Sequence, residues 1–133
     1  SFSSFNLFQI TYGNGIFIAA GSFGGVLRST DLGQTWNEQV VGEYDIRQLI
    51  HTHRGFLLSN GSEIYYSEDG SIWEVLLEGD IKILNVIGDR VFGSRGSAFF
   101  ELNLAEAFPH WEEMHIFSQN QPISRMHLAR VEP

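Results

Sequence analysis

Hydrophobic and polar positions along this chain alternate in short runs that end at glycine or asparagine. Three of these runs, IFIAAG, FLLSNG and VFGSRG, end at Gly21, Gly61 and Gly96. Each has an apolar run before it (LFQITYG, IRQLIHT and IKILNVIG) and another after it, at residues 26–28, 64–66 and 99–101. Short runs of β-branched and aromatic residues between turn-forming residues are typical of β-strands. The pattern therefore predicts three successive groups of strands.

The connections between the runs carry signals of their own. YGNG at residues 12–15 and THRG at residues 52–55 predict hairpin turns, the first through its Asn-Gly pair. LNLAEAF at residues 102–108 predicts one helical turn that ends before Pro109. ISRMHLARV begins the strand pattern again, which predicts an extra strand within residues 121–133.

Tryptophan marks a repeat along the chain. Trp73 follows Trp36 by 37 positions and Trp111 follows Trp73 by 38, so the three tryptophans share one period. One unit consists of three short strands, a turn and a fourth strand that carries the tryptophan, and its length suits a propeller blade of about 40 residues. The sequence predicts an all-β, β-propeller-like domain of about three four-stranded antiparallel blades. The blades are expected at residues 5–42, 43–79 and 80–118.

The turn that leads to the first tryptophan, STDLGQTW, resembles the Asp-box, also called the bacterial neuraminidase repeat. This repeat occurs in sialidases, sortilin-type receptors, photosystem assembly factors and many bacterial and phage surface proteins. Its defined positions are matched by Ser29, Asp31, Gly33, Thr35 and Trp36. SEDGSIW matches with a turn one residue shorter, through Ser67, Asp69, Gly70 and Trp73, whereas the third unit keeps only Trp111. The resemblance implies a structural role, because in sialidases the box lies away from the active site.

The residue types of the box suit a tight turn. The aspartate can accept hydrogen bonds from backbone N–H groups that the turn leaves unpaired, and the hydroxyls can bridge the rest. Glycine supplies a positive φ without Cβ strain. The tryptophan can bury its face between sheets while its indole N–H finds an acceptor.

The number of blades raises the question of closure. Closed propellers have typically 4–8 blades, and an open array leaves sheet faces and edges uncovered. Two arrangements resolve this: a homo-oligomer, in which a dimer completes a six-bladed ring, or a longer chain that supplies the missing blades.

Composition excludes some partners and chemistries. The net charge is −8, with a single lysine, Lys82, and scattered arginines, which disfavours nucleic acid and anionic membranes. The absence of cysteine removes disulfides, zinc–thiolate sites and thiol nucleophiles. No run approaches the roughly 20 apolar residues that a membrane span needs, so no membrane insertion is expected. The N-terminus lacks signal-peptide features. The compartment stays open, and the resemblance favours an extracellular, cell-surface or virion-associated location.

Candidate catalytic and metal-ligating groups are sparse. A sialidase-type site needs an arginine triad, which Arg47, Arg90 and Arg125 can supply in principle, although the Arg-Ile-Pro signature of those enzymes is absent. No pair of carboxylates stands out for glycoside hydrolysis. In HTH, the alternation of a strand places His51 and His53 on one face, where zinc binding needs a third ligand. We expect no catalytic residue, no metal and no cofactor.

Aromatic residues in or near loops are the candidates for ligand binding. They are Phe23, Tyr44, Tyr65 and Tyr66. Exposed aromatics stack on sugars or pack at protein interfaces, and the alternative is that these residues fill the core between blades. The sequence therefore favours a non-catalytic binding or assembly module whose ligand is a glycan, a receptor surface or a partner subunit. A fragment of a sialidase-type glycoside hydrolase and a purely structural oligomerisation piece remain alternatives.

Overall fold

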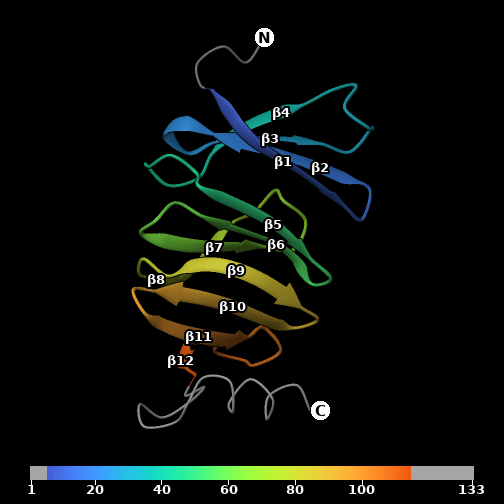
Figure 1. Ribbon diagram of the computed structural model, residues 1–133. Coiled ribbons are helices and arrows are strands. Elements are labelled where there is room, and N and C mark those ends of the chain that lie inside the picture. Colours follow the sequence, from blue (N-terminus) through green and yellow to red (C-terminus); the bar gives the residue numbers. More distant parts are fainter. Residues whose placement is uncertain (1–5, 115–133) are drawn as a thin grey trace, which may run out of the picture.

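The computed structural model describes residues 6–114, which form three four-stranded antiparallel sheets (Figure 1). The first sheet consists of β1 (Leu7–Gly13), β2 (Ile16–Gly21), β3 (Gly25–Ser29) and β4 (Asn37–Val40). The second consists of β5 (Gln48–Thr52), β6 (Gly55–Ser59), β7 (Glu63–Ser67) and β8 (Glu74–Glu78). The third consists of β9 (Lys82–Ile87), β10 (Arg90–Arg95), β11 (Ala98–Asn103) and β12 (Glu112–Glu113). The predicted all-β class and the three four-stranded antiparallel sheets are confirmed.

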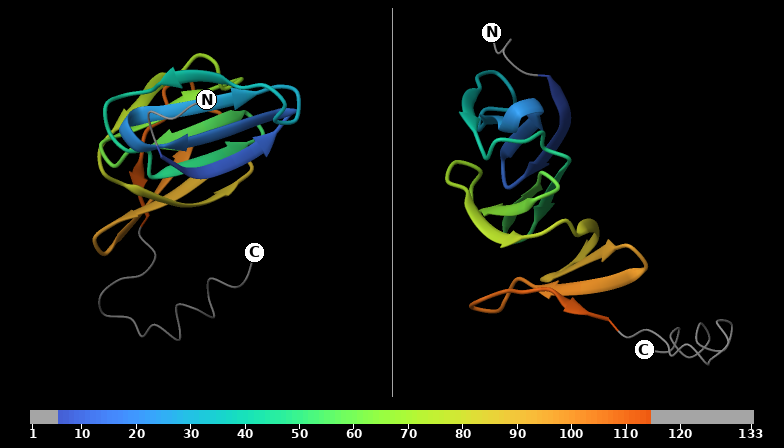
Figure 2. Two further views of the ribbon diagram at one scale, coloured as in Figure 1. Left: turned by 90° about the horizontal axis from the view of Figure 1, so that it is seen from above. Right: turned by 90° about the vertical axis from the view of Figure 1, so that its left-hand side faces the viewer.

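Each sheet is a meander, because its strands pair in chain order. The sheets follow one another as layers, from the first near the N-terminal end to the third near the C-terminal end (Figures 1 and 2). The only helical element among residues 6–114 is a single 3-10 turn, η1 (Ser22–Gly24), and no helix of this region is long and apolar enough to cross a membrane. The predicted extra strand at residues 121–133 lies outside the described residues.

Both predicted hairpin turns are confirmed. Asn14 and Gly15 connect β1 to β2, and both have the positive φ that a tight two-residue hairpin requires. His53 and Arg54 connect β5 to β6.

Two local predictions are wrong. The predicted helical turn at residues 102–108 is absent, because Leu102 is buried in β11 opposite Val91 and stays extended. The side chain of Asn103 then accepts a hydrogen bond from the N–H of Ala105, and the N–H of Glu106 donates to the carbonyl of Asn103 at 3.3 Å, which closes an isolated turn and no helix. The tryptophans do not lie in the fourth strands, since Trp36, Trp73 and Trp111 each come one residue before β4, β8 or β12.

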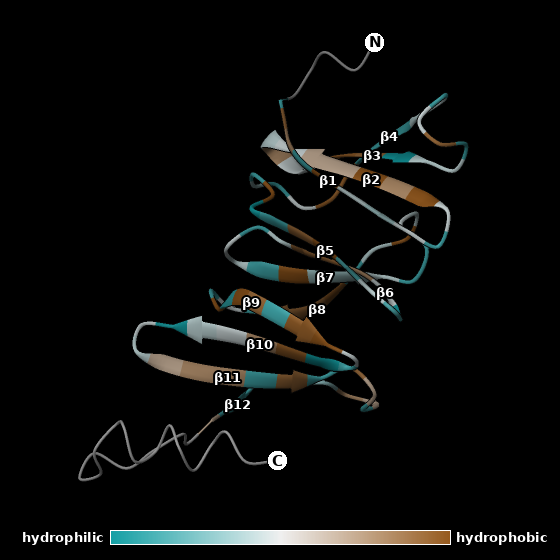
Figure 3. Cartoon of the chain, turned by 45° about the vertical axis from the view of Figure 1, so that its right-hand side comes forward, coloured by the Kyte–Doolittle hydropathy of each residue, from teal (hydrophilic) through white to brown (hydrophobic). Residues whose placement is uncertain are grey.

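Two hydrophobic cores lie between the layers. The first core joins the first and second sheets and the segment between them; its buried members are Ile18, Ala20, Val26, Val41, Ile46, Leu49, Phe56, Leu58 and Tyr65, with Trp73 packed against them. The second core joins the second and third sheets; its buried members are Leu57, Ile64, Ile83, Val91 and Leu102, with Trp111 packed against them. Brown, hydrophobic segments accordingly appear in all three layers (Figure 3). The second sheet contributes to both cores because successive side chains of a strand point to opposite faces.

Polar side chains also connect the layers. The amide of Gln9 in β1 donates to the carbonyl of Arg47, at the start of the second sheet. Gln48 in β5 repeats this toward the third sheet: its Nε2 donates to the carbonyl of Ile83 at 2.5 Å, and its Oε1 accepts from the N–H of Ile83 at 2.9 Å. The two interfaces are therefore built on the same plan.

Candidate functional site

The first predicted box turn is held by its own side chains. The Ser29 hydroxyl accepts from the N–H of Gly33 at 2.8 Å and donates to Asp31 Oδ1 at 2.8 Å. The same Oδ1 accepts from the N–H of Thr35 at 2.9 Å, and Asp31 Oδ2 accepts from the Thr35 hydroxyl at 2.6 Å. The indole N–H of Trp36 donates to the carbonyl of Gly33 at 3.0 Å. Both carboxylate oxygens of Asp31 are thus engaged within the turn.

These hydrogen bonds change the acidity of the aspartate. Donation from the Thr35 hydroxyl, followed by the Thr35 N–H and the Ser29 hydroxyl, lowers the pKa of Asp31 to about 2. An acid of this strength stays ionised at neutral pH, so Asp31 is an acceptor and a poor proton donor.

The second predicted box turn repeats this arrangement in shorter form. The Ser67 hydroxyl accepts from the N–H of Gly70 at 2.7 Å, and Asp69 Oδ1 accepts from the N–H and the hydroxyl of Ser71 at 2.9 and 2.8 Å. The bonds from Ser71 lower the pKa of Asp69. The indole N–H of Trp73 donates to the carbonyl of Gly70 at 3.1 Å, as Trp36 does to Gly33.

The two turns differ in what surrounds them. The second turn packs against the first sheet: Arg28 Nε donates to the carbonyl of Asp69 at 2.8 Å, and Gln39 Nε2 donates to the carbonyl of Gly70 at 2.7 Å. A Cβ on Gly70 would lie 2.4 Å from Ile18 Cδ1. A Cβ on Gly33 would meet, among the described residues, only the ring of its own Trp36, at 3.5 Å.

The third sheet has no serine in the place of Ser29 and Ser67, as its register shows. Ser29 pairs with Phe17, and Ser67 pairs with Phe56. The residue in the same place of the third sheet is Leu102, which pairs with Val91 and is buried in the second core. Without a hydroxyl at this position, only Trp111 of the pattern remains.

The structure separates the four aromatic candidates. Tyr65 is buried in the first core, with its hydroxyl donating to Glu63 Oε1 at 2.9 Å. Tyr66 packs against the second core, and its hydroxyl donates to the carbonyl of Arg54. Phe23 and Tyr44, in contrast, expose 70% and 54% of their surface. Tyr65 and Tyr66 therefore belong to the hydrophobic cores and not to a ligand-binding surface.

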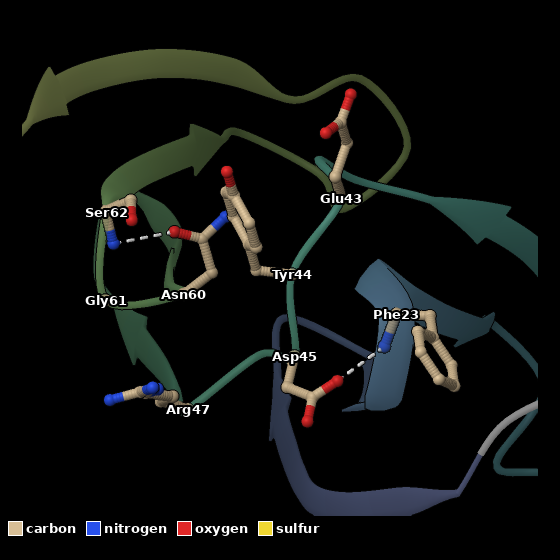
Figure 4. Close-up of a pocket in the computed structure, with 8 residues that line it drawn as sticks. All are labelled: Phe23, Glu43, Tyr44, Asp45, Arg47, Asn60, Gly61 and Ser62. Atoms are coloured by element: carbon tan, nitrogen blue, oxygen red, sulfur yellow. Dashed lines mark hydrogen bonds between the residues drawn. The ribbon is translucent and has the colours of Figure 1, made fainter.

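Phe23 and Tyr44 line one cavity of about 380 Å³ between the first and second sheets (Figure 4). The other lining residues are Glu43, Asp45, Arg47, Asn60, Gly61 and Ser62. They come from three elements: η1, the segment between β4 and β5, and the β6–β7 turn. This convergence was not predicted, because it depends on contacts between residues far apart in the sequence.

A second exposed feature is the face of the first sheet that points away from the second sheet. Antiparallel partners share a face, so the partners Tyr12 and Phe17, and likewise Ile10 and Ala19, lie together there. We define the outer face by these four residues with Leu27, Trp36 and Val40. Ile10, Tyr12 and Val40 are 61%, 47% and 69% exposed, while Ala19 and Leu27 in the middle are buried. Phe17 packs between Tyr12 and Trp36, with ring centroids 4.6 and 6.2 Å away.

The residues proposed for other chemistry are not brought together. Arg47 lies at the cavity, whereas Arg90 is in the third sheet and pairs with Glu101 at 3.1 Å; Arg125 is outside the described residues. His53 is in a turn and not in a strand, where it contacts Asp89 at 2.7 Å, so the predicted same-face pair with His51 is wrong. Residues 6–114 contain no group of three or more side chains arranged to hold a metal ion.

The comparisons with known proteins identify no family for this chain. The chain matches no family model, no curated protein and no solved structure.

Proposed function

We propose that the protein is a non-catalytic assembly module made of propeller-like, Asp-box-type sheets, and that its outer face binds another β-sheet. The observation that carries this proposal is an equivalence of positions. Ile10, Tyr12, Phe17 and Ala19 of the first sheet occupy the same register positions as Leu49, His51, Phe56 and Leu58 of the second. The second set is packed against the first sheet, whereas the first set forms the exposed outer face.

The equivalence extends to the third sheet and to the tryptophans. The second sheet covers Ile83 and Val91, with Trp111 packed beside them, as the first sheet covers Leu49 and Phe56, with Trp73 beside them. In the first sheet Trp36 lies on the outer face, with Phe17 as its aromatic neighbour. A further sheet on the outer face would give Trp36 a core to pack against, as Trp73 and Trp111, which are themselves only partly buried, pack against theirs.

The occupant we propose is the third sheet of a second copy. Within residues 6–114, no other sheet covers the face of the third sheet opposite the second core, which we call its free face; on it Phe92 is half-buried and Ile87 and Phe99 are exposed. Lys82 on this face stands at the register position that Gln9 and Gln48 use to bind the next sheet. Two copies joined in this way would contribute six sheets, a number within the usual range for closed propellers.

Mixing two damaged chains tests this arrangement. Ile10→Lys places a charge on the outer face, and Phe99→Lys places one on the free face of the third sheet. Ile72→Lys, at a more exposed turn residue off both faces, is the control. We expect Ile10→Lys and Phe99→Lys to be monomers alone and to associate when mixed, because each keeps the face that the other lacks.

The outcomes distinguish the arrangements. If the outer faces bound each other symmetrically, Phe99→Lys alone would still dimerise, which would overturn the head-to-tail arrangement. If neither substitution changed the molar mass while Ile72→Lys behaved like the unmodified chain, the outer face would not be an assembly surface.

A further inference from the structure

We propose that the cavity between the first and second sheets is a binding site for a neutral saccharide, with Phe23 and Tyr44 as the stacking surfaces. The site is independent of the assembly proposed above, because none of its lining residues belongs to the outer face. It has a volume of about 380 Å³, which lies within the range of about 300–1,000 Å³ for small-molecule sites.

Phe23 combines a strained backbone conformation with an exposed side chain, a combination that does not stabilise the fold. Its φ of 56° lies in the left-handed region, which is costly for a bulky side chain and suits glycine or asparagine. Phe23 is 70% exposed, so burial does not compensate for this conformation. Strain of this kind clusters at functional sites, where the surrounding structure holds it in place.

The surroundings of Phe23 are held firmly. Its N–H donates to Asp45 Oδ1 at 2.9 Å, which fastens η1 to the segment between the sheets (Figure 4). Two backbone bonds of 2.8 Å flank this contact, from the N–H of Val41 to the carbonyl of Gly24 and from the N–H of Ile46 to the carbonyl of Gly21. These bonds fasten the backbone at Phe23 to the segment that carries Tyr44, so both residues lie at the cavity without a ligand.

The polar lining favours hydroxyl groups as partners. Asn60 Oδ1 is used by the N–H groups of Ser62 and Glu63, at 3.0 and 2.8 Å, so Asn60 shapes the β6–β7 turn. Arg47 and the Ser62 hydroxyl offer donors, and Glu43 and Asp45 offer acceptors. Hydroxyls can both donate and accept, whereas one arginine against two carboxylates opposes an anionic ligand.

Phe23 and Tyr44 add a second requirement, that the ligand has an apolar face. The C–H face of a pyranose ring packs on an aromatic ring, and an exposed tyrosine also presents a hydroxyl at its tip. A neutral saccharide combines an apolar face with a rim of hydroxyls, and this is the combination that the cavity offers.

Calorimetric titration tests the proposal, with neutral oligosaccharides chosen by a glycan array that also carries sialylated ones. The informative variant is Phe23→Gly, which removes the ring and suits the positive φ. We expect Phe23→Gly to weaken binding by about tenfold or more while the melting temperature is unchanged or higher. Phe108→Gly, at an 87% exposed phenylalanine outside the cavity, is the matched control and should bind normally.

Several results would overturn the proposal: no neutral saccharide bound by the unmodified protein, binding restricted to sialylated glycans, or full affinity in Phe23→Gly. A lower melting temperature in Phe23→Gly would indicate that the ring stabilises the fold, and Tyr44→Ala would then decide, since Tyr44 is exposed and its loss should also weaken binding. The monomeric Ile10→Lys variant should keep its saccharide affinity, so failure of the assembly proposal and failure of this one give different results.

Discussion

The outer face of the first sheet and the equivalent face of the second sheet carry the same pattern in two different environments. The aromatic pair Tyr12 and Phe17 has its counterpart in His51 and Phe56, with ring centroids 4.6 and 5.1 Å apart. Phe56 is fully buried, whereas its counterpart Phe17 is only half-buried. The difference shows that a neighbouring sheet, and not the strand pattern itself, decides which apolar face becomes core.

The turns at residues 29–36 and 67–73 show the same contrast. Gly70 is packed against Ile18, and its carbonyl accepts a bond from Gln39, whereas among residues 6–114 a Cβ on Gly33 would meet only the ring of its own Trp36. Equivalent substitutions at the two sites should therefore lower the free energy of unfolding by different amounts. The difference measures how much a neighbouring sheet contributes to stability.

Truncation of the two equivalent phenylalanines should give the largest difference. Phe56→Ala should lower the free energy of unfolding by about 3–5 kcal/mol, since a fully buried ring is lost and a cavity remains. Phe17→Ala should cost less, because Phe17 is only partly buried. Urea unfolding at concentrations where the chain is monomeric checks this, and equal costs at the two sites would refute the comparison.

Alanine at the two turn glycines should give the next largest difference. Both glycines have positive φ, 81° at Gly70 and 87° at Gly33, so alanine is strained by about 1–2 kcal/mol at either site. Gly70→Ala adds a clash with Ile18, which should bring the total to about 3 kcal/mol. The same unfolding measurement applies, and a Gly33→Ala cost as large as that of Gly70→Ala would show that the first turn is also covered.

The change in stability at acidic pH should differ least between the two turns. The pKa of Asp31 is lowered from its ordinary value of 3.8 to about 2, so its contribution to stability is complete above the ordinary value and is lost as the pH falls through this interval. Asp31→Asn should flatten the stability curve between about pH 4 and pH 2.

Asp69→Asn should flatten the stability curve over the same pH interval less than Asp31→Asn does. Asp69 accepts bonds from the N–H and hydroxyl of Ser71, whereas Asp31 accepts from the N–H and hydroxyl of Thr35 and also from Ser29. Thermal melts across this range, compared with the unmodified chain, check both; a larger effect for Asp69→Asn would contradict the hydrogen-bond account.

The strands and hairpins could be predicted because their signals are local. Alternation in LFQITYG places Ile10 and Tyr12 on one face, and Asn14 and Gly15 specify the turn that follows. The helical turn predicted at residues 102–108 failed because burial of Leu102 against Val91, a tertiary contact, overrides the helix-forming composition.

The candidate sites were only partly predictable. Phe23 and Tyr44 could be singled out as loop aromatics, but their meeting at one cavity depends on contacts such as the bond from Phe23 to Asp45, 22 residues apart. Likewise, the alternation that assigns residues to the outer face does not say whether a sheet covers that face, because that depends on packing between units.

The molar mass in solution tests the central claim, that the outer face is a surface built to be covered by another sheet. Sedimentation equilibrium should give twice the chain mass of 15.0 kDa for the unmodified protein and for Ile72→Lys, and 15.0 kDa for Ile10→Lys. A mass of 15.0 kDa for the unmodified protein across the accessible concentration range would contradict self-assembly through this face.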